Sequence, residues 1–187
     1  MGLMPTLPRS GPLTLEDFEA IRDVDDGHRY ELIDGTLVVT PAPVPAHQNA
    51  VQELFLRLHG TKPADIRVFV APLDIRFAGD TVLQPDVLVV PRSAVGGRRI
   101  EGDPLLAVEV LSPSTRTFDL GAKLLRYQRA GTPAYWVIDP DEPSLRVWEL
   151  RDDVYVEVAH VTGDEVARLS LPWPVEIMPS QLVDDLR

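Results

Sequence analysis

The sequence predicts an α/β fold in which a mixed central β-sheet is flanked by helices and carries extra antiparallel hairpins. Strand-like runs outnumber helical ones, and two pairs of them are joined by short turns that favour antiparallel pairing. One helix follows the most apolar strand, and further strands come after that helix. This order favours a mixed sheet over a doubly wound parallel one.

The elements of the first half follow from local patterns. Residues 14–24 predict a helix that begins with a capping box, because Asp17 stands three positions after Thr14. Residues 29–40 predict a hairpin with its turn at Asp34-Gly35. After a proline-rich bend, residues 47–59 have apolar side chains at helical spacing. Three strands are then expected, over residues 66–72, 73–79 and 82–90.

The second half begins with a strand over residues 105–111. One helix is expected over residues 115–131 and ends at Gly131. A strand over residues 134–139 follows, and then a hairpin over residues 144–159 with Asp152-Asp153 near its turn. Residues 165–172 predict a last strand, and the tail has room for one helical turn.

Length and composition indicate one ordinary globular unit. The chain has 187 residues, of which 44% are hydrophobic and 25% charged. We expect a flexible tail over residues 1–12 and one domain over residues 13–187. No apolar run approaches the roughly 20 residues of a membrane helix, and the start of the chain lacks a secretory pattern. We therefore expect a cytoplasmic protein with no membrane partner.

Two further features exclude classes of chemistry. The chain has no cysteine, so disulfides, zinc–thiolate sites and thiol catalysis are excluded. Its net charge of −11 excludes a uniformly basic surface. A nucleic-acid partner would have to meet a local basic patch, or a metal ion that offsets the acidity. Arginines for such a patch occur in the loop before residue 105 and in the helix after it: Arg92, Arg98, Arg99, Arg116, Arg126 and Arg129.

Two acids interrupt strands that are otherwise apolar. Glu109 lies within the run "LLAVEVL" and shares a strand face with Ala107. Asp86 follows Pro85 and begins the run "DVLVV". An unpaired buried charge costs several kcal/mol, so each acid needs a cation, a hydrogen-bonding partner or a proton.

A divalent cation between the two acids would meet that need. Mg²⁺ is typically held by one or two carboxylates together with waters and phosphate oxygens. The alternative is structural: each acid lies at a solvated strand end or pairs with an arginine. Lys123 is the third member of the set, because helical spacing places it on the apolar stripe beside Leu120 and Tyr127. The alternative interpretation of Lys123 is structural: its aliphatic chain packs along the core while its ammonium group reaches water.

These motifs resemble those of a known family. The segments "QPDVLVV", "LLAVEVLSPST" and "AKLLRYQRAGTPAYWVIDP", in this order, are similar to the Uma-type family of restriction endonucleases, within the PD-(D/E)XK nuclease superfamily. The upstream segments "YELIDGTLVVTPAP" and "HQNAVQELFLRL" extend the resemblance over residues 13–157. The resemblance implies a restriction-endonuclease-like fold with a mixed sheet, and Mg²⁺ or Mn²⁺ as the cofactor.

The chain departs from the superfamily pattern at one position. Leu111 occupies the place of the lysine, and Lys123 on the following helix stands in for it. The resemblance also implies a catalytic role for Glu31, which shares a strand face with Ile33. The expected catalytic residues are thus Asp86, Glu109, Lys123 and Glu31. The expected metal ligands are Asp86, Glu109 and the backbone carbonyl of Val110. His47, at the start of a helix, is left without an assigned role.

The sequence therefore predicts a metal-dependent DNA endonuclease that hydrolyses phosphodiester bonds. DNA is the expected partner, and a homodimer is expected because cutting two strands with one small site calls for two-fold symmetry. A second hypothesis is a catalytically inactive, nuclease-like binding module, which the acidic charge and Leu111 favour. A third, a hydrolase of small molecules, lacks a phosphate loop or a nucleophile elbow to support it.

Overall fold

The computed structural model describes residues 11–22, 27–77, 79–96, 100 and 103–183 of the chain. Most of the tail predicted over residues 1–12, and Arg98 and Arg99 of the predicted basic patch, lie outside these residues. Within the described part, no helix is both long and apolar enough to span a membrane.

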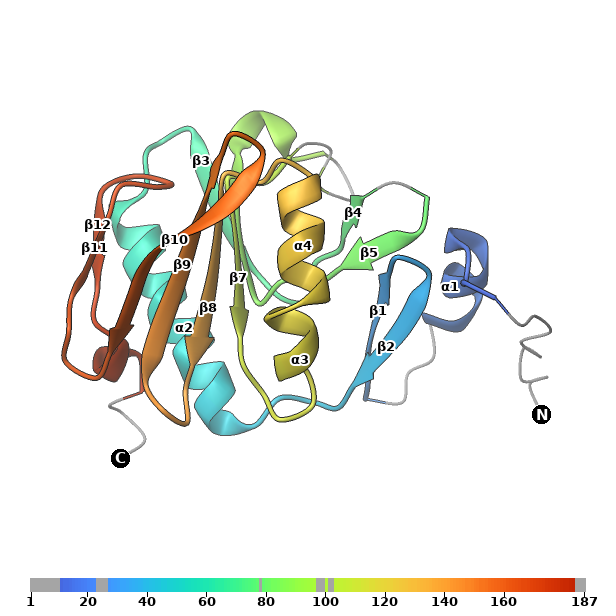
Figure 1. Ribbon diagram of the computed structural model, residues 1–187, viewed down its shortest axis with the longest axis horizontal. Helices are drawn as coiled ribbons and strands as arrows, with labels where there is room; N and C mark the ends of the chain where they lie inside the picture. The colour runs from blue at the N-terminus through green and yellow to red at the C-terminus, as the bar shows by residue number, and fades with distance from the viewer. Residues whose placement is uncertain (1–10, 23–26, 78, 97–99, 101–102, 184–187) are drawn as a thin grey trace.

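The core of the fold is a six-stranded mixed sheet with the strand order β10-β9-β8-β7-β6-β3 (Figure 1). Its strands are β3 (Ile66–Val70), β6 (Val87–Pro91), β7 (Leu106–Val110), β8 (Ala134–Asp139), β9 (Ser144–Arg151) and β10 (Val154–Thr162). β7 and β8 pair in parallel, whereas the other neighbours are antiparallel. The predicted mixed α/β fold is confirmed.

Two smaller antiparallel sheets accompany the central one. The first has the order β2-β1-β5-β4 and consists of β1 (Arg29–Ile33), β2 (Thr36–Thr40), β4 (Ile75–Phe77) and β5 (Thr81–Leu83). The second pairs β11 (Ala167–Leu169) with β12 (Val175–Ile177). β1 and β2 form the predicted hairpin, in which Asp34 and Gly35 adopt the positive φ angles of 47° and 77° that a tight hairpin turn requires.

Helices cover both faces of the central sheet (Figure 1). The helical segments are α1 (Leu15–Arg22), α2 (Pro45–Thr61), α3 (Arg116–Asp119) and α4 (Ala122–Arg129), with short 3₁₀ turns η1 (Arg92–Ala94) and η2 (Pro179–Leu182). On one face Leu54 of α2 packs in a core with Val87 and Val108. On the other face Tyr127 of α4 packs with Leu88. β7 is therefore covered on both sides, as its sequence, apolar except for Glu109, predicts.

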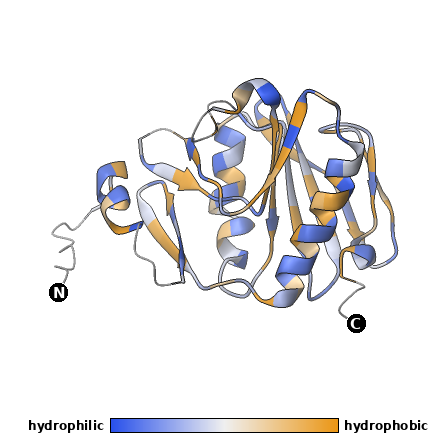
Figure 2. Cartoon of the chain, turned by 180° about the vertical axis from the view of Figure 1, so that it is seen from behind, coloured by the Kyte–Doolittle hydropathy of each residue, from blue (hydrophilic) through white to orange (hydrophobic). Residues whose placement is uncertain are grey.

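The hydropathy pattern agrees with this layering. Figure 2 shows apolar strands enclosed between helices whose outer faces are largely hydrophilic. α1 closes the smaller sheet, where Phe18 packs against Leu32 and Val82. Its predicted capping box is confirmed: the Thr14 backbone N–H donates to Asp17 at 2.9 Å, and the Asp17 N–H donates to the Thr14 hydroxyl at 3.2 Å.

Three element predictions were wrong in detail. The helix expected over residues 115–131 is divided into α3 and α4 at Gly121, where a Cβ atom would lie 2.9 Å from the backbone oxygen of Thr117. The strand expected over residues 82–90 is divided into β5 and β6, so Asp86 lies just before β6 and not inside a strand. The strand over residues 165–172 is not the last, because β12 follows it.

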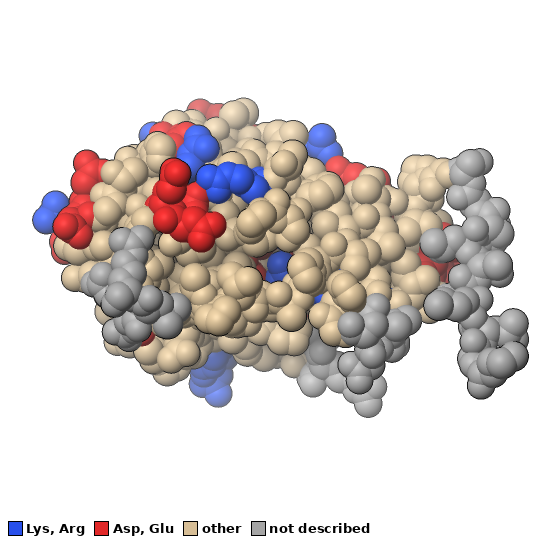
Figure 3. Space-filling view, turned by 90° about the horizontal axis from the view of Figure 1, so that it is seen from below, with Lys and Arg blue, Asp and Glu red and all other residues tan. Residues whose placement is uncertain are grey.

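The surface is not uniformly charged. The face seen in Figure 3 is mostly uncharged, with acidic and basic side chains gathered toward one end. A hollow near the middle of this face contains a small basic surface.

Candidate active site

The two strand acids meet on one side of the central sheet. β6 and β7 pair with Val87 opposite Val108, so the register places Asp86 opposite Glu109 at the end of the ladder. Glu109 shares its strand face with Ala107, on the α4 side. Both side chains are buried, with exposures of 2% for Asp86 and 1% for Glu109. Directly opposed residues on the same face lie close together, so two carboxylates here repel unless cations neutralise them.

Lys123 supplies one of these cations. It lies in the first turn of α4 and is fully buried, at 0% exposure. Its Nζ atom lies 3.0 Å from Glu31 Oε2, 3.2 Å from Glu109 Oε1 and 3.1 Å from Asp119 Oδ1. None of these contacts has well-aligned hydrogen-bond geometry, so the ammonium group is held mainly by charge.

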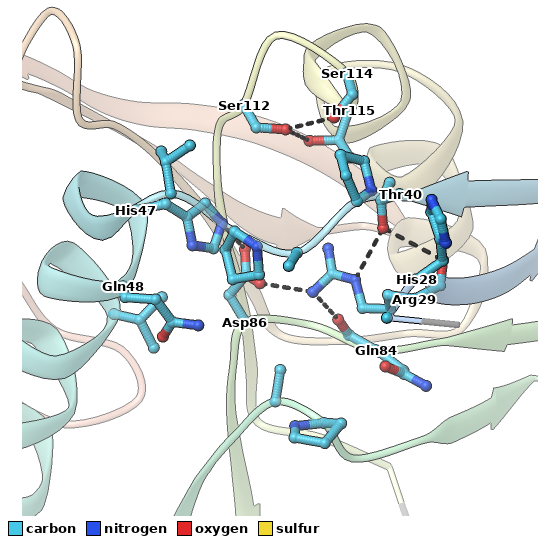
Figure 4. Close-up of a pocket in the computed structure, with 18 of the residues that line it drawn as sticks. His28, Arg29, Thr40, His47, Gln48, Gln84, Asp86, Ser112, Ser114 and Thr115 are labelled. Carbon is cyan, nitrogen blue, oxygen red and sulfur yellow. Dashed lines mark hydrogen bonds and ion pairs between the residues drawn. The ribbon is translucent and has the colours of Figure 1, made fainter. Parts of the chain in front are cut away.

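Arg29 supplies the second cation, and it forms an ion pair with Asp86. Its Nη1 atom donates to Asp86 Oδ1 at 2.8 Å (Figure 4). The other carboxylate oxygen of Asp86 contacts His47 Nε2 at 3.2 Å and accepts a hydrogen bond from the Val110 backbone N–H at 2.8 Å. Asp86 thus joins the β1–β2 hairpin, the start of α2 and the end of β7. The last of these bonds also fixes the carboxylate of Asp86 next to Glu109.

Glu31 connects the smaller sheet to the same cluster. Its Oε1 atom accepts a hydrogen bond from the Gln84 backbone N–H at 2.8 Å, and its Oε2 atom faces Lys123. Glu31 is fully buried, at 0% exposure. The hairpin position therefore places this acid inside the molecule, in the polar interior between the two sheets.

The cluster carries more negative than positive charge. Four buried carboxylates, those of Glu31, Asp86, Glu109 and Asp119, face the two permanent cations Arg29 and Lys123. With all four ionised, an excess of two negative charges remains. An excess of this kind, deep in a protein, requires protons or an additional cation.

The ionisation of each acid reflects this imbalance. Burial raises the pKa of Glu109 well above its usual value, and the negative charges of Asp119, Asp86 and Glu31 raise it further against the opposing effect of Lys123. Burial also raises the pKa of Asp119. For Asp86, burial opposes ionisation, but the hydrogen bond to His47, the charges of Arg29 and His47 and the Val110 N–H together lower its pKa to about 2.

Lys123 stays charged in this setting. Burial favours its neutral form, but Glu109, Glu31 and Asp119 together raise its pKa above the usual value. Asp86 and Lys123 are therefore ionised at neutral pH, and Glu109 is the acid most disposed to hold a proton when no further cation is present.

The structure brings together the four residues expected from the sequence, and adds partners that sequence reasoning missed. Asp119 was missed although it stands four residues before the inward-facing Lys123 on the helical stripe. Arg29 was missed although it stands two residues before Glu31 and so shares its strand face. Both signals were present in the sequence. His47, which had no assigned role, contacts Asp86.

Other residues singled out from the sequence lie elsewhere. Leu111, in the superfamily's lysine place, is buried in the apolar core of the α4 face. Arg116 pairs with Asp139 at 2.6 Å, and Arg129 pairs with Asp34 at 3.3 Å. Since these arginines have acidic partners, they do not form an uncompensated basic patch.

The donor set fits a hard divalent cation with few protein ligands. Among the described residues, no group of three or more His, Asp and Glu side chains is placed to hold a metal ion. The protein ligands would be Asp86 and Glu109, with the Val110 carbonyl, and Glu109 Oε2 lacks a hydrogen-bonding partner in the described part of the chain. Two carboxylates completed by waters and phosphate oxygens are a usual arrangement for Mg²⁺.

Comparisons with known proteins agree with this architecture. The model of the Uma2 family, described as "Putative restriction endonuclease", matches residues 15–178. Among solved structures, the crystal structure of a protein described as "a putative nuclease belonging to DUF820" from Anabaena variabilis matches with a TM-score of 0.67 and 23% identity, over 94% of each chain. At this identity, the likeness shows a shared fold. No curated protein matches the chain.

Proposed function

The chain belongs to the Uma2 family of restriction-endonuclease-like proteins, and on that premise we propose that it is a metal-dependent nuclease that hydrolyses phosphodiester bonds in DNA. The observation that carries the proposal is the buried cluster of four carboxylates around two permanent cations. A purely structural network is most stable when its charges balance, and this one has two more carboxylates than permanent cations, so full ionisation would leave an excess of two negative charges.

The residues that would hold the metal are Asp86 and Glu109, with the backbone carbonyl of Val110. A divalent ion bound there would supply a water of lowered pKa and would offset negative charge on the phosphate. Glu109 has the free carboxylate oxygen, and Asp86 is ionised over the whole physiological range.

The remaining residues position this pair. Lys123 restrains the Glu109 carboxylate at 3.2 Å and keeps a positive charge beside it. Once Glu109 engages a metal, the Lys123 ammonium is the donor best placed to steady a water or a phosphate oxygen. Glu31 and Asp119 hold Lys123 in place. His47 and the Val110 N–H hold Asp86 Oδ2 and Arg29 holds Oδ1, so a metal held by Asp86 would have to displace one of these partners.

The test is cleavage of plasmid DNA by the purified protein with Mg²⁺ or Mn²⁺. We expect cleavage that a chelator abolishes and that Asp86→Asn and Glu109→Gln each remove. The matched control is Asp34→Asn, because Asp34 is a partly exposed acid in the β1–β2 turn that pairs with Arg129 away from the cluster. Metal-dependent cleavage that survives Asp86→Asn would refute the assignment.

A binding module that does not cut is the second candidate. It is favoured by the closed state of the cluster, in which Arg29 and Lys123 already occupy the carboxylates, and by Leu111 in the superfamily's lysine place. DNA binding without cleavage, at metal concentrations that would saturate the proposed site at Asp86 and Glu109, would favour this candidate over the enzyme.

A homodimer is part of the proposal for any substrate in which both strands are cut, because that calls for two copies of the site. The molar mass in solution, measured by light scattering with and without DNA, tests it directly. A monomer under both conditions would restrict each protein molecule to one strand at a time.

A further inference from the structure

A cavity of about 590 Å³ lies beside the acid cluster. It lies between the start of α2, the preceding residues 41–44, the start of the β1–β2 hairpin and the residues 112–115 that follow β7 (Figure 4). Asp86 lines this cavity, whereas the described lining includes none of Glu31, Glu109, Asp119 and Lys123. A phosphodiester that approaches the buried acids through this cavity reaches Asp86 first.

One side of the cavity is suited to a phosphate. Arg29 lines it, as do the hydroxyl groups of Ser112, Ser114 and Thr115, which are linked at 3.0 Å through Ser112 Oγ. α2 begins here without a side-chain cap and without an acidic residue in its first turn. Its free backbone N–H groups therefore give this wall a partial positive charge.

His47 is an independent sign of a missing ligand on the same side. It lines the cavity and is only 6% exposed. Its Nε2 atom contacts Asp86, but its Nδ1 atom is buried without a hydrogen-bonding partner among the described residues. A buried ring nitrogen without a partner indicates a hydrogen-bond donor or acceptor beyond those that the described residues supply.

The same lining also contains apolar residues. Pro41, Pro43, Val44, Pro72 and Pro113 contribute rings and short aliphatic groups to it. Flat apolar walls of this kind suit the face of a nucleobase, and cavities of about 300–1,000 Å³ take ligands of small-molecule size. The cavity therefore has the dimensions of one nucleotide, with polar groups for its phosphate and apolar groups for its base.

An intact duplex fits this surface poorly. Duplex binding depends on many phosphate contacts, and the permanent cations that line the cavity are Arg22 and Arg29, each already paired with an acid. A base inside a duplex also cannot enter a cavity unless it is unstacked first, which costs a few kcal/mol and least where it is already unpaired.

We propose that this cavity binds one unpaired nucleotide of the substrate strand, so that the protein acts on single-stranded or locally unpaired DNA in preference to intact duplex. The inference rests on the proposed nuclease function for the cutting step. The binding of the unpaired nucleotide depends only on the cavity. In this proposal the base contacts the proline rings that line the cavity. Its phosphate contacts Arg29, the hydroxyl groups of residues 112–115 and the start of α2.

The first experiment compares three fluorescent oligonucleotides of one sequence: a single strand, a perfect duplex and a duplex with a central unpaired bulge. Binding is followed by anisotropy with Mg²⁺ and the Glu109→Gln variant, since Glu109 is not among the residues that line the cavity and its loss prevents cutting. We expect the single strand and the bulged duplex to bind about tenfold more tightly than the perfect duplex. Wild-type cleavage of the same three substrates is measured in parallel.

The second experiment alters the cavity alone. Ala42 is an exposed residue on its wall, so Ala42→Glu adds a negative charge there without disturbing the core. Leu56→Glu, on the exposed side of α2, adds the same charge away from the cavity and is the matched control. We expect Ala42→Glu to weaken single-strand binding about tenfold and Leu56→Glu to change it less than about twofold, because solvent screens distant surface charges.

Each outcome decides one of the two ideas. Equal or tighter binding of the perfect duplex, no binding of any oligonucleotide, or no effect of Ala42→Glu would overturn the cavity proposal. Cavity-dependent binding of single strands without cleavage of any substrate would support the cavity proposal and refute the nuclease. Rapid cutting of the perfect duplex would support the nuclease and refute the cavity proposal.

Discussion

Arg29 Nη1 lies 2.8 Å from Asp86 Oδ1, so a cation of the β1–β2 hairpin occupies the carboxylate oxygen that a metal ion would need. The ion pair joins the smaller sheet to the end of the central one. A metal ion at the proposed site would therefore compete with Arg29 for this oxygen, and Arg29 would stabilise the metal-free state.

This competition predicts opposite effects of Arg29→Gln on stability and on metal binding. Asp86 is buried, so removal of Arg29 should lower the free energy of unfolding by about 2–4 kcal/mol in chelator. The affinity for Mn²⁺ or Mg²⁺, measured by calorimetry, should rise. Arg76→Gln is the control: Arg76 pairs with Glu19 at the surface, where a pair contributes about 0–1 kcal/mol. An unchanged or weaker metal affinity in Arg29→Gln would contradict the competition.

Lys123 should be essential for folding as well as for turnover. Its removal leaves three buried carboxylates without their shared cation, so Lys123→Met should cost about 3–5 kcal/mol in urea unfolding. Adding Glu31→Gln should recover part of this loss, because one uncompensated charge disappears. A double-mutant cycle should give a coupling of about 1–3 kcal/mol, and strict additivity would show that the two side chains do not interact.

Glu109→Gln should separate stability from function. The amide resembles the protonated acid, and it relieves the repulsion among the cluster's carboxylates. We expect the metal-free variant to be more stable by about 1 kcal/mol, a rise in Tm of about 2–4 °C, while metal binding and cleavage are lost. Thermal unfolding in chelator measures the first effect, and a destabilised variant would show that Glu109 is ionised and well compensated.

The stability of the metal-free protein should fall as pH rises above the usual pKa of a glutamate, 4.5. Glu109 has a usual pKa of 4.5 that burial raises, so the folded state binds more protons than the unfolded state above this pH. The slope of unfolding free energy against pH is therefore negative from about pH 5 through the raised pKa. The lowered pKa of Asp86 makes the unfolding free energy rise with pH, but only between about 2 and its usual pKa of 3.8. Glu109→Gln should flatten this negative slope in chelator, and a slope equal to that of the wild type would assign it to other groups.

Two glycines should respond oppositely to alanine. Gly60 lies in α2 with open space around its position, so Gly60→Ala should stabilise the protein by about 0.5–1 kcal/mol through helix propensity. Gly121 separates α3 from α4, and a Cβ atom there would lie 2.9 Å from the Thr117 backbone oxygen. Gly121→Ala should therefore destabilise by about 1–3 kcal/mol, as overpacking does. Stabilisation by both substitutions would indicate a continuous helix.

The sequence predicts most of this site because alternation in strands and spacing in helices are local properties. Glu109 stands out in an apolar strand, and the same rules would have found Asp119 from Lys123 and Arg29 from Glu31. The contact of His47 with Asp86 depends on the path of the proline-rich bend across the sheet, which no local pattern determines. The break at Gly121 was missed because its cause is a backbone approach that appears only once the turn has formed.

The register between β6 and β7 sets the distance between the two acids. Val87 faces Val108 and Val89 faces Leu106, and these pairs fix the ladder regardless of how the chain travels from one strand to the other. Insertions in the connecting segment should therefore be tolerated during divergence of the family. The loss of a single residue within β7 ahead of Glu109 would instead turn its carboxylate toward α2, and no change of side chain elsewhere would restore the site.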